Sequence, residues 1–184
     1  MTTKPLKEGA TYDDLRDVPD HYVAEMFDGE LYASPRPALP HAHASSVLGA
    51  KLSVAFHRLG HGGWLILDEP ELHFGNDVLV PDLAGWRRER LPALPPDAYL
   101  TLAPDWVCEI LSPSTEALDR GKKLHRYARE GVAHVWLIEP LRQTLEVLSL
   151  VSGKWERLAL HEGQAKVRVP PFDAIELELG SLWI

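Results

Sequence analysis

Residues 105–115 read Asp-Trp-Val-Cys-Glu-Ile-Leu-Ser-Pro-Ser-Thr, and the fold prediction starts from them. The first seven form a mostly apolar run of strand length, which is typical of a central strand covered on both faces. The next four supply residues that end a strand and cap a helix, and 116–130 are predicted to be a helix that ends at Gly131. A second buried strand is predicted over 132–138. This strand, helix and strand form the centre of the predicted fold.

The remaining segments surround that unit with further strands and one more helix. Before it, the sequence predicts a hairpin over 21–34 around Asp28-Gly29, and a helix over 43–59 that ends near Gly60 and follows a break at Pro40. Short strands are expected over 64–68, 72–74 and 78–86, the last two joined as a second hairpin. After it, alternation over 144–150, 154–160 and 175–179 predicts an antiparallel meander. The fold class is therefore α+β, with a mixed central sheet flanked by two helices, an added N-terminal hairpin and a C-terminal antiparallel meander.

The composition is that of a globular chain. Its 184 residues suit one domain, predicted over 21–184, with 1–20 as an N-terminal extension. The single thiol, Cys108, can form no intramolecular disulfide, and no segment reaches the ~20 apolar residues of a membrane span, so we expect a cytoplasmic protein that does not bind membranes. The formal net charge of −8 argues against a basic nucleic-acid-binding module.

Two acidic residues interrupt apolar strands. Glu109 lies inside the run 105–111, and Asp82 follows Pro81 inside the run 78–86. A buried acid is costly unless it is paired, hydrogen-bonded or bound to a metal. Each acid could sit at a strand end and accept hydrogen bonds from backbone or arginine groups. If the two converge on neighbouring strands, they would instead form a site for a hard cation such as Mg²⁺ or Mn²⁺.

An ordered set of motifs extends beyond these two acids. It comprises Asp28-Gly29-Glu30-Leu31, Val80-Pro81-Asp82-Leu83, Val107-Cys108-Glu109-Ile110-Leu111-Ser112-Pro113-Ser114-Thr115, then Asp119, Lys123 and Tyr127, and finally Gly131-Val132 with Val135-Trp136-Leu137-Ile138-Glu139-Pro140. The set resembles the Uma family of restriction-endonuclease-like proteins, and the resemblance continues to 172–183. It implies the PD-(D/E)XK nuclease fold, with the order of elements that periodicity predicts.

The resemblance also implies roles for individual residues. The acid after proline and the acid of the third strand hold the metal in this fold, and they correspond to Asp82 and Glu109. The lysine expected two residues after the strand acid is replaced by Leu111. The resemblance implies instead a lysine from the following helix, where Lys122 and Lys123 flank the buried stripe at similar angles.

Spacing within that helix favours Lys123. Asp119, Lys123 and Tyr127 lie at successive i, i+4 steps, which matches the family's Asp, Lys, Tyr spacing. The alternative is that Asp119 and Lys123 form a surface ion pair worth a few tenths of a kcal/mol.

Two further residues are weaker candidates. Glu30 belongs to the family's Asp-Gly-Glu hairpin and could add a carboxylate, or it could be an exposed acid after a turn. His43, like its neighbour His41, lies where the first helix is predicted to begin, and it could face either a substrate groove or solvent.

These residues together predict a metal-dependent endonuclease that hydrolyses DNA phosphodiester bonds. Asp82 and Glu109 would hold Mg²⁺ or Mn²⁺, while Lys123 would orient or deprotonate the attacking water or stabilise developing negative charge. One alternative is a catalytically inactive nuclease fold that acts as a binding or regulatory module, and another is a hydrolase of a different phosphoester. A free sheet edge in the hairpin or meander could also pair two chains into a homodimer.

Overall fold

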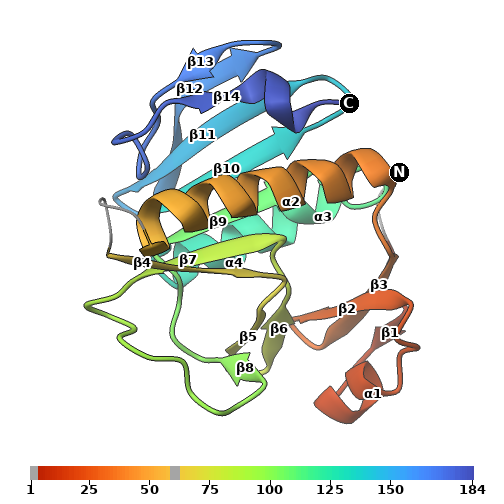
Figure 1. Cartoon of the computed structure of the whole chain (residues 1–184). Coiled ribbons are helices and arrows are strands. Elements are labelled where there is room, and N and C mark those ends of the chain that lie inside the picture. Colours follow the sequence, from red (N-terminus) through yellow and green to blue (C-terminus); the bar gives the residue numbers. More distant parts are fainter. Residues whose placement is uncertain (1–3, 59–62) are drawn as a thin grey trace.

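Two six-stranded sheets organise the protein, for which a computed structural model describes residues 4–58 and 63–184 (Figure 1). The central sheet has the order β12-β11-β10-β9-β7-β4. Its strands are β4 (Trp64–Asp68), β7 (Leu83–Arg87), β9 (Trp106–Ile110), β10 (His134–Glu139), β11 (Thr144–Val151) and β12 (Lys154–Glu162). The second sheet has the order β1-β3-β2-β6-β5-β8. Its strands are β1 (Lys7–Glu8), β2 (Tyr22–Phe27), β3 (Glu30–Pro35), β5 (Glu71–Phe74), β6 (Asp77–Leu79) and β8 (Tyr99–Leu100).

Strands β9 and β10 are the parallel pair at the middle of the central sheet, with Glu109 opposite Leu137. Parallel neighbours need a long crossover. The crossover consists of α3 (Glu116–Leu118), a π-helical segment (Asp119–Lys123) and α4 (Leu124–Arg129). It is followed by Gly131 with a φ of 75°. The predicted strand, helix and strand are therefore confirmed, although the middle of the helix is π-helical.

Helices cover both faces of the central sheet (Figure 1). Helix α2 (Leu39–Ser53) lies on one face, where Leu48 and Ile110 belong to the same hydrophobic cluster. The crossover helix lies on the other face, where Tyr127 and Leu111 belong to a second cluster. Side chains along β9 thus alternate between the two faces. The α+β class with a mixed central sheet between helices is confirmed.

The N-terminal hairpin forms as predicted. Strands β2 and β3 pair around Asp28 and Gly29, whose φ angles of 51° and 76° suit a tight hairpin turn. Residues of the predicted extension join this hairpin, because β1 pairs with β3 and α1 (Tyr12–Arg16) packs Leu15 against Met26.

The run 78–86 is not one strand, and that prediction was wrong. Strand β6 belongs to the second sheet and β7 to the central sheet, so the chain passes from one sheet to the other over 80–82. Pro81 has no N–H to donate, and proline rarely continues a hydrogen-bonded ladder. Asp82 therefore lies at the entrance to β7 instead of in the middle of a strand.

Helix α2 begins earlier than predicted. It starts at Leu39 and includes Pro40, because proline is tolerated in the first turn, where its missing N–H has no helical partner to lose. The helix continues as a π-helical segment (Val54–Arg58), and its predicted end near Gly60 lies outside the described residues.

The C-terminal meander is confirmed only for its first two strands, β11 and β12. The predicted third strand contributes β14 (Leu177–Glu178), which pairs with β13 (Lys166–Val167) in a separate two-stranded sheet. Val167 and Leu177 are buried in the cluster on the α2 side, so this segment folds onto the sheet face instead of extending its edge.

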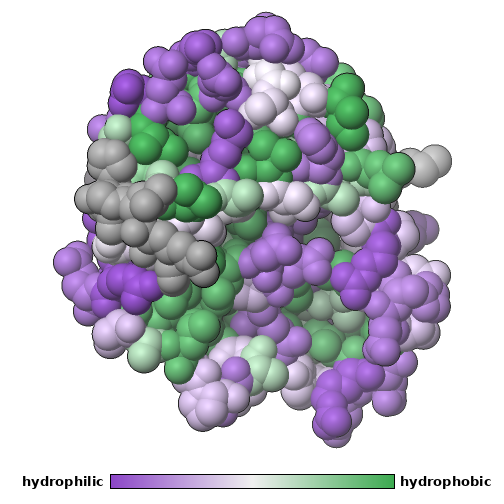
Figure 2. Space-filling model, in the orientation of Figure 1, coloured by the Kyte–Doolittle hydropathy of each residue, from purple (hydrophilic) through white to green (hydrophobic). Residues whose placement is uncertain are grey.

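The surface shown in Figure 2 is mixed in character. Hydrophilic residues gather along the upper rim over β12 and β13 and at the lower right over β1 and α1. Within the described ranges, 4–58 and 63–184, no helix is long and apolar enough to cross a membrane.

Candidate active site

Asp82 connects three elements at the point where the chain enters the central sheet. Its Oδ2 accepts a hydrogen bond of 2.6 Å from the backbone N–H of Ile110 in β9. Its Oδ1 lies 2.7 Å from Nε2 of His41 in the first turn of α2. The carboxylate is therefore held in one orientation by a neighbouring strand and a helix.

Glu109 points from β9 toward the crossover helix and is only 1% exposed. Its Oε1 accepts a hydrogen bond of 2.5 Å from the Tyr127 hydroxyl, and its Oε2 accepts one of 3.0 Å from Lys123 Nζ. Both partners come from the helix that follows this strand. The local fold therefore brings an acid, an ammonium group and a phenol together.

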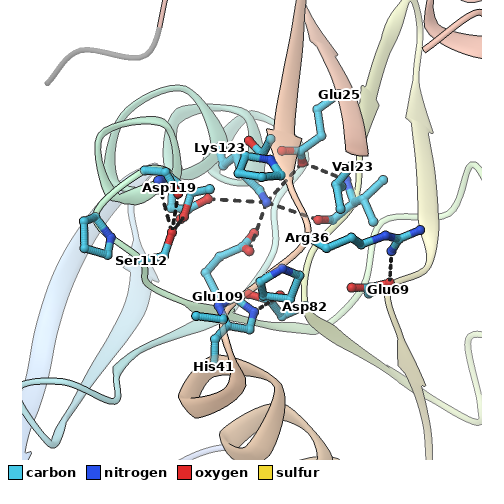
Figure 3. A pocket seen from close by; sticks show the side chains of 18 residues that line it. Val23, Glu25, Arg36, His41, Glu69, Asp82, Glu109, Ser112, Asp119 and Lys123 are labelled. Atoms are coloured by element: carbon cyan, nitrogen blue, oxygen red, sulfur yellow. Dashed lines mark hydrogen bonds and ion pairs between the residues drawn. The ribbon is translucent and has the colours of Figure 1, made fainter. Parts of the chain in front are cut away.

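Lys123 is at the centre of the buried charges (Figure 3). In addition to Glu109, its Nζ lies 3.0 Å from Glu25 Oε1 and 3.5 Å from Asp119 Oδ1, and it donates to the Val80 carbonyl at 3.2 Å. Lys123 ends the π-helical segment, and π-helical turns occur frequently at functional sites.

The cluster contains more negative than positive charge. Burial raises the pKa of Glu109 well above its ordinary value and raises the pKa of Asp119 to about 6. Burial alone would lower the pKa of Lys123, but the carboxylates of Glu109 and Glu25 outweigh it and hold that pKa well above its usual range. Lys123 is therefore protonated at neutral pH and lies among an excess of acidic groups.

These side chains line a cavity of about 320 Å³ between the second sheet and the central sheet (Figure 3). Its titratable lining residues are Glu25, Arg36, His41, Glu69, Asp82, Glu109, Asp119 and Lys123. A loop of three small hydroxyl residues and one proline, Ser112 to Thr115, forms another part of its wall. The cavity is large enough to admit a phosphate group with bound water.

The donor set suits a hard cation that keeps several water ligands. Within residues 4–58 and 63–184, no three His, Cys, Asp or Glu side chains are arranged to bind a metal ion by themselves. Asp82 and Glu109 both line the cavity, and a carboxylate oxygen that accepts one hydrogen bond retains another lone pair. Mg²⁺ is commonly held by one or two carboxylates and completed by water and substrate phosphates. The two acids fit that pattern.

Similarity to known proteins gives independent information on this chain. A family model described as "Uma2: Putative restriction endonuclease" matches residues 10–180. The chain belongs to the Uma2 family. The family description supports a nuclease-like function, and the resemblance recognised in the sequence motifs is confirmed.

Individual proteins similar to this Uma2 chain include one solved structure and one relative known by sequence. A crystal structure of "a putative nuclease belonging to DUF820" from Anabaena variabilis is 25% identical, with a TM-score of 0.73 over 94% of this chain and 96% of that chain. This match confirms the restriction-endonuclease-like fold. The uncharacterized protein slr1290 of Synechocystis sp. is 32% identical over 122 residues, which are 62% of this chain and 58% of that protein. The match therefore spans less than two thirds of that relative.

The Uma2 structure brings five of the predicted site residues into one cluster. They are Asp82, Glu109, Asp119, Lys123 and Tyr127. Two others lie elsewhere. Glu30 accepts a hydrogen bond of 2.6 Å from Lys122, and His43 Nε2 lies 3.2 Å from the Ser181 carbonyl oxygen.

Glu25 is the site residue that the sequence prediction missed, and His41 is one that it named only beside His43. Glu25 is 4% exposed and lies in β2 between apolar neighbours, the same signal of a buried strand acid that identified Glu109. His41 was considered with His43, and the two could be separated only by the observed start of α2. Lys123 reaches the cluster, whereas Lys122 pairs with Glu30 outside it.

Proposed function

We propose that this Uma2 protein is a divalent-metal-dependent endonuclease that hydrolyses DNA phosphodiester bonds. One observation carries the proposal: Asp82, Glu109 and Lys123 come from separate elements and line the same cavity. The family description and the nuclease neighbour support the same reaction class.

Each carboxylate is fixed before substrate arrives. Asp82 is held by Ile110 and His41, and Glu109 is held by Lys123 and Tyr127. Mg²⁺ or Mn²⁺ bound by these two acids would lower the pKa of a bound water and offset charge on the scissile phosphate. Preorganised groups of this kind lower the reorganisation needed in the transition state.

Lys123 has an electrostatic role in this proposal. Its raised pKa keeps the ammonium group protonated, so it is suited to stabilise developing negative charge or to orient a water molecule. A general base would need a pKa closer to the working pH. Of the roles that the sequence left open for Lys123, proton abstraction is therefore the least favoured.

The alternative, an inactive nuclease fold that binds or regulates, was motivated by Leu111. Leu111 is 3% exposed and belongs to the apolar cluster beside the crossover helix. Lys123 places an ammonium group 3.0 Å from Glu109, so the charge that position 111 lacks is supplied from the helix. This contact favours an active site over the inactive alternative.

Nicking of supercoiled DNA with Mg²⁺ or Mn²⁺ tests the proposal directly. Asp82→Asn and Glu109→Gln preserve side-chain shape. Loss of a residue that only supports a metal ligand typically lowers activity roughly 10–100-fold, so loss of a ligand itself should reduce nicking by more than that. Asp77→Asn is the matched control, because Asp77 is also buried and ion-paired, to Arg126 at 2.8 Å, but does not line the cavity.

The outcomes separate the alternatives. Nicking that is unchanged in both site variants would exclude these residues from the reaction. A wild-type chain that binds Mn²⁺ in calorimetry and binds DNA, but cleaves neither DNA nor other phosphodiesters, would support the regulatory module. An equal loss of nicking in Asp77→Asn would show that instability, not chemistry, explains the site variants.

The proposed homodimer would use a sheet edge. Strand β12 lies at one edge of the central sheet, and its Leu158 is 51% exposed. Edge strands can pair with a second chain. Light scattering should then give twice the chain mass of 20.6 kDa, and a mass of one chain would contradict the dimer.

A further inference from the structure

Arg36 and Glu69 face each other in the lining of the cavity, apart from the buried cluster (Figure 3). Nη1 of Arg36 lies 3.3 Å from Oε2 of Glu69, and Nη2 donates to the Asp20 carbonyl at 2.9 Å. The two side chains are 53% and 39% exposed. Both line the cavity that contains Asp82 and Lys123, so this ion pair stands where a substrate would enter.

Arg36 is an exposed cation in a cavity lined mainly by acids. The described lining residues include five acids, and their cationic side chains other than histidine are Arg36 and Lys123. Lys123 is 4% exposed and is already in contact with three carboxylates. A phosphate that approaches from solvent therefore meets Arg36 as the accessible positive charge. The guanidinium group offers several donors in a planar arrangement that matches phosphate oxygens.

Glu69 holds this arginine from an unusual backbone position. Its φ is 44°, in the left-handed region that non-glycine residues seldom adopt, and it immediately precedes Pro70, which further limits its conformation. Its N–H donates to the carbonyl of Asp82 at 3.1 Å. Such strained residues persist only where the surrounding structure holds them, and they cluster at functional sites. The turn thus fixes the partner of Arg36 relative to the proposed metal-binding acid.

The ion pair itself is weak enough to exchange. Exposed ion pairs typically contribute about 0–1 kcal/mol, because both charges remain solvated. A hydrogen bond from a charged donor to a phosphate is stronger. A substrate phosphate can therefore displace Glu69 from Arg36 at little cost.

We propose that Arg36 binds a phosphate oxygen of the DNA strand at the mouth of the cavity, and that Glu69 holds the guanidinium group there until the strand replaces it. Arg36 is then a substrate-binding residue, and Glu69 is a positioning residue that competes with the phosphate. This inference rests on the proposed nuclease function, because it takes DNA as the substrate.

Salt-dependent DNA binding tests this role without requiring cleavage. Fluorescence anisotropy of a labelled oligonucleotide, measured without metal over a series of KCl concentrations, reports the number of phosphate contacts. Arg36→Ala should weaken binding about tenfold. It should also reduce the magnitude of the salt slope by about 0.9 for duplex or about 0.7 for single-stranded DNA. A purely structural role for Arg36 would not change that slope.

Three companion variants sharpen the result. Arg36→Lys should keep the slope but lose part of the affinity, because the charge remains and the planar fork does not. Glu69→Gln should tighten binding up to about fivefold by removing the competing carboxylate. Arg142→Ala is the matched control, since Arg142 is also an exposed arginine, paired with Glu139 at 3.1 Å, and does not line the cavity.

The inference and the proposed function fail in different ways. An Arg36→Ala variant with wild-type slope and affinity would overturn the inference even if the protein nicks DNA. An equal change in Arg142→Ala, or no DNA binding by the wild-type chain at low salt, would overturn it as well. If the protein never nicks DNA but Arg36→Ala still changes the slope, the phosphate contact stands and the nuclease proposal fails.

Discussion

Replacing Lys123 by methionine removes the cation from the buried cluster while keeping a side chain of similar length. Lys123 Nζ lies 3.0 Å from both Glu109 and Glu25 and 3.5 Å from Asp119, and its side chain is 4% exposed. Removing one partner of a buried ion pair typically costs about 3–5 kcal/mol, because the remaining charge is left uncompensated. For a chain of this size each kcal/mol lowers Tm by about 2–4 °C, so we expect a decrease of roughly 10 °C at neutral pH.

The loss of stability in Lys123→Met should be larger at high pH than at low pH. Acids whose pKa is raised in the folded state bind more protons there than in the unfolded state, so stability falls as pH rises between the ordinary and the raised pKa. The pKa of Glu109 is already well above its ordinary value, and that of Asp119 is about 6. Without the ammonium of Lys123, both should rise further. The variant should therefore be least stable relative to wild type above about pH 7 and should recover toward about pH 5, where the acids take up protons.

Thermal unfolding at several pH values measures this effect, and Lys122→Met is the matched control. Lys122 is the adjacent lysine and pairs with Glu30 at 2.6 Å, but its side chain is 39% exposed, so its loss should cost less than about 1 kcal/mol. Lys123→Met should also lose nicking activity, whereas Lys122→Met should keep it. Equal decreases in Tm for the two variants, or a Lys123→Met decrease that does not change with pH, would refute the reasoning.

Three further outcomes follow from the same structure. Asp119→Asn should flatten the pH dependence of the free energy of unfolding between about pH 4 and 6. Over that range the raised pKa of Asp119 should lower the free energy of unfolding of the wild type by roughly 3 kcal/mol. Urea unfolding at several pH values measures this, and the same change of stability with pH in both proteins would contradict it. In the Lys123→Met background, Leu111→Lys should restore part of the nicking activity, because position 111 directly follows β9 and continues the face on which Glu109 lies. A double variant as inactive as the single one would count against this prediction. Burial raises the pKa of Cys108 well above its ordinary value, so the native thiol should resist alkylation that proceeds readily in urea, as mass spectrometry can show.

The centre of the fold could be predicted because its signals are local. The apolar run that becomes β9, the capping residues after it and Gly131 at the end of the helix each specify structure within a few positions. Two of the proposed catalytic residues, Glu109 and Lys123, lie inside this unit. The helix geometry left Lys122 and Lys123 open, and only the match of Asp119, Lys123 and Tyr127 to the family's spacing favoured Lys123.

The rest of the site depends on contacts that no local pattern encodes. His41 meets Asp82 across 41 positions, and the Val80 N–H meets the Glu25 carboxylate across 55. Both contacts exist because the chain changes sheets over 80–82, and the run 78–86 gave no sign of that change except Pro81. Glu25 could have been noticed as an acid among apolar strand residues. The sequence gives no indication of the residues that contact it, so it could not be distinguished from other acids in hairpins.

The lysine of this site, Lys123, comes from the crossover helix, and Leu111 occupies the position after the strand where the nuclease fold usually has a lysine. This arrangement affects the whole site. Leu111 fills the apolar cluster with Tyr127, and Tyr127 in turn donates to Glu109. Lys123 approaches the same carboxylate from the helix, where its ammonium group is almost completely buried and lies near three acids. Its positive charge is therefore largely neutralised by these acids, and it attracts a phosphate at the mouth of the cavity only weakly. A substrate phosphate then needs a second, exposed cation, and Arg36 occupies the position where that cation would act.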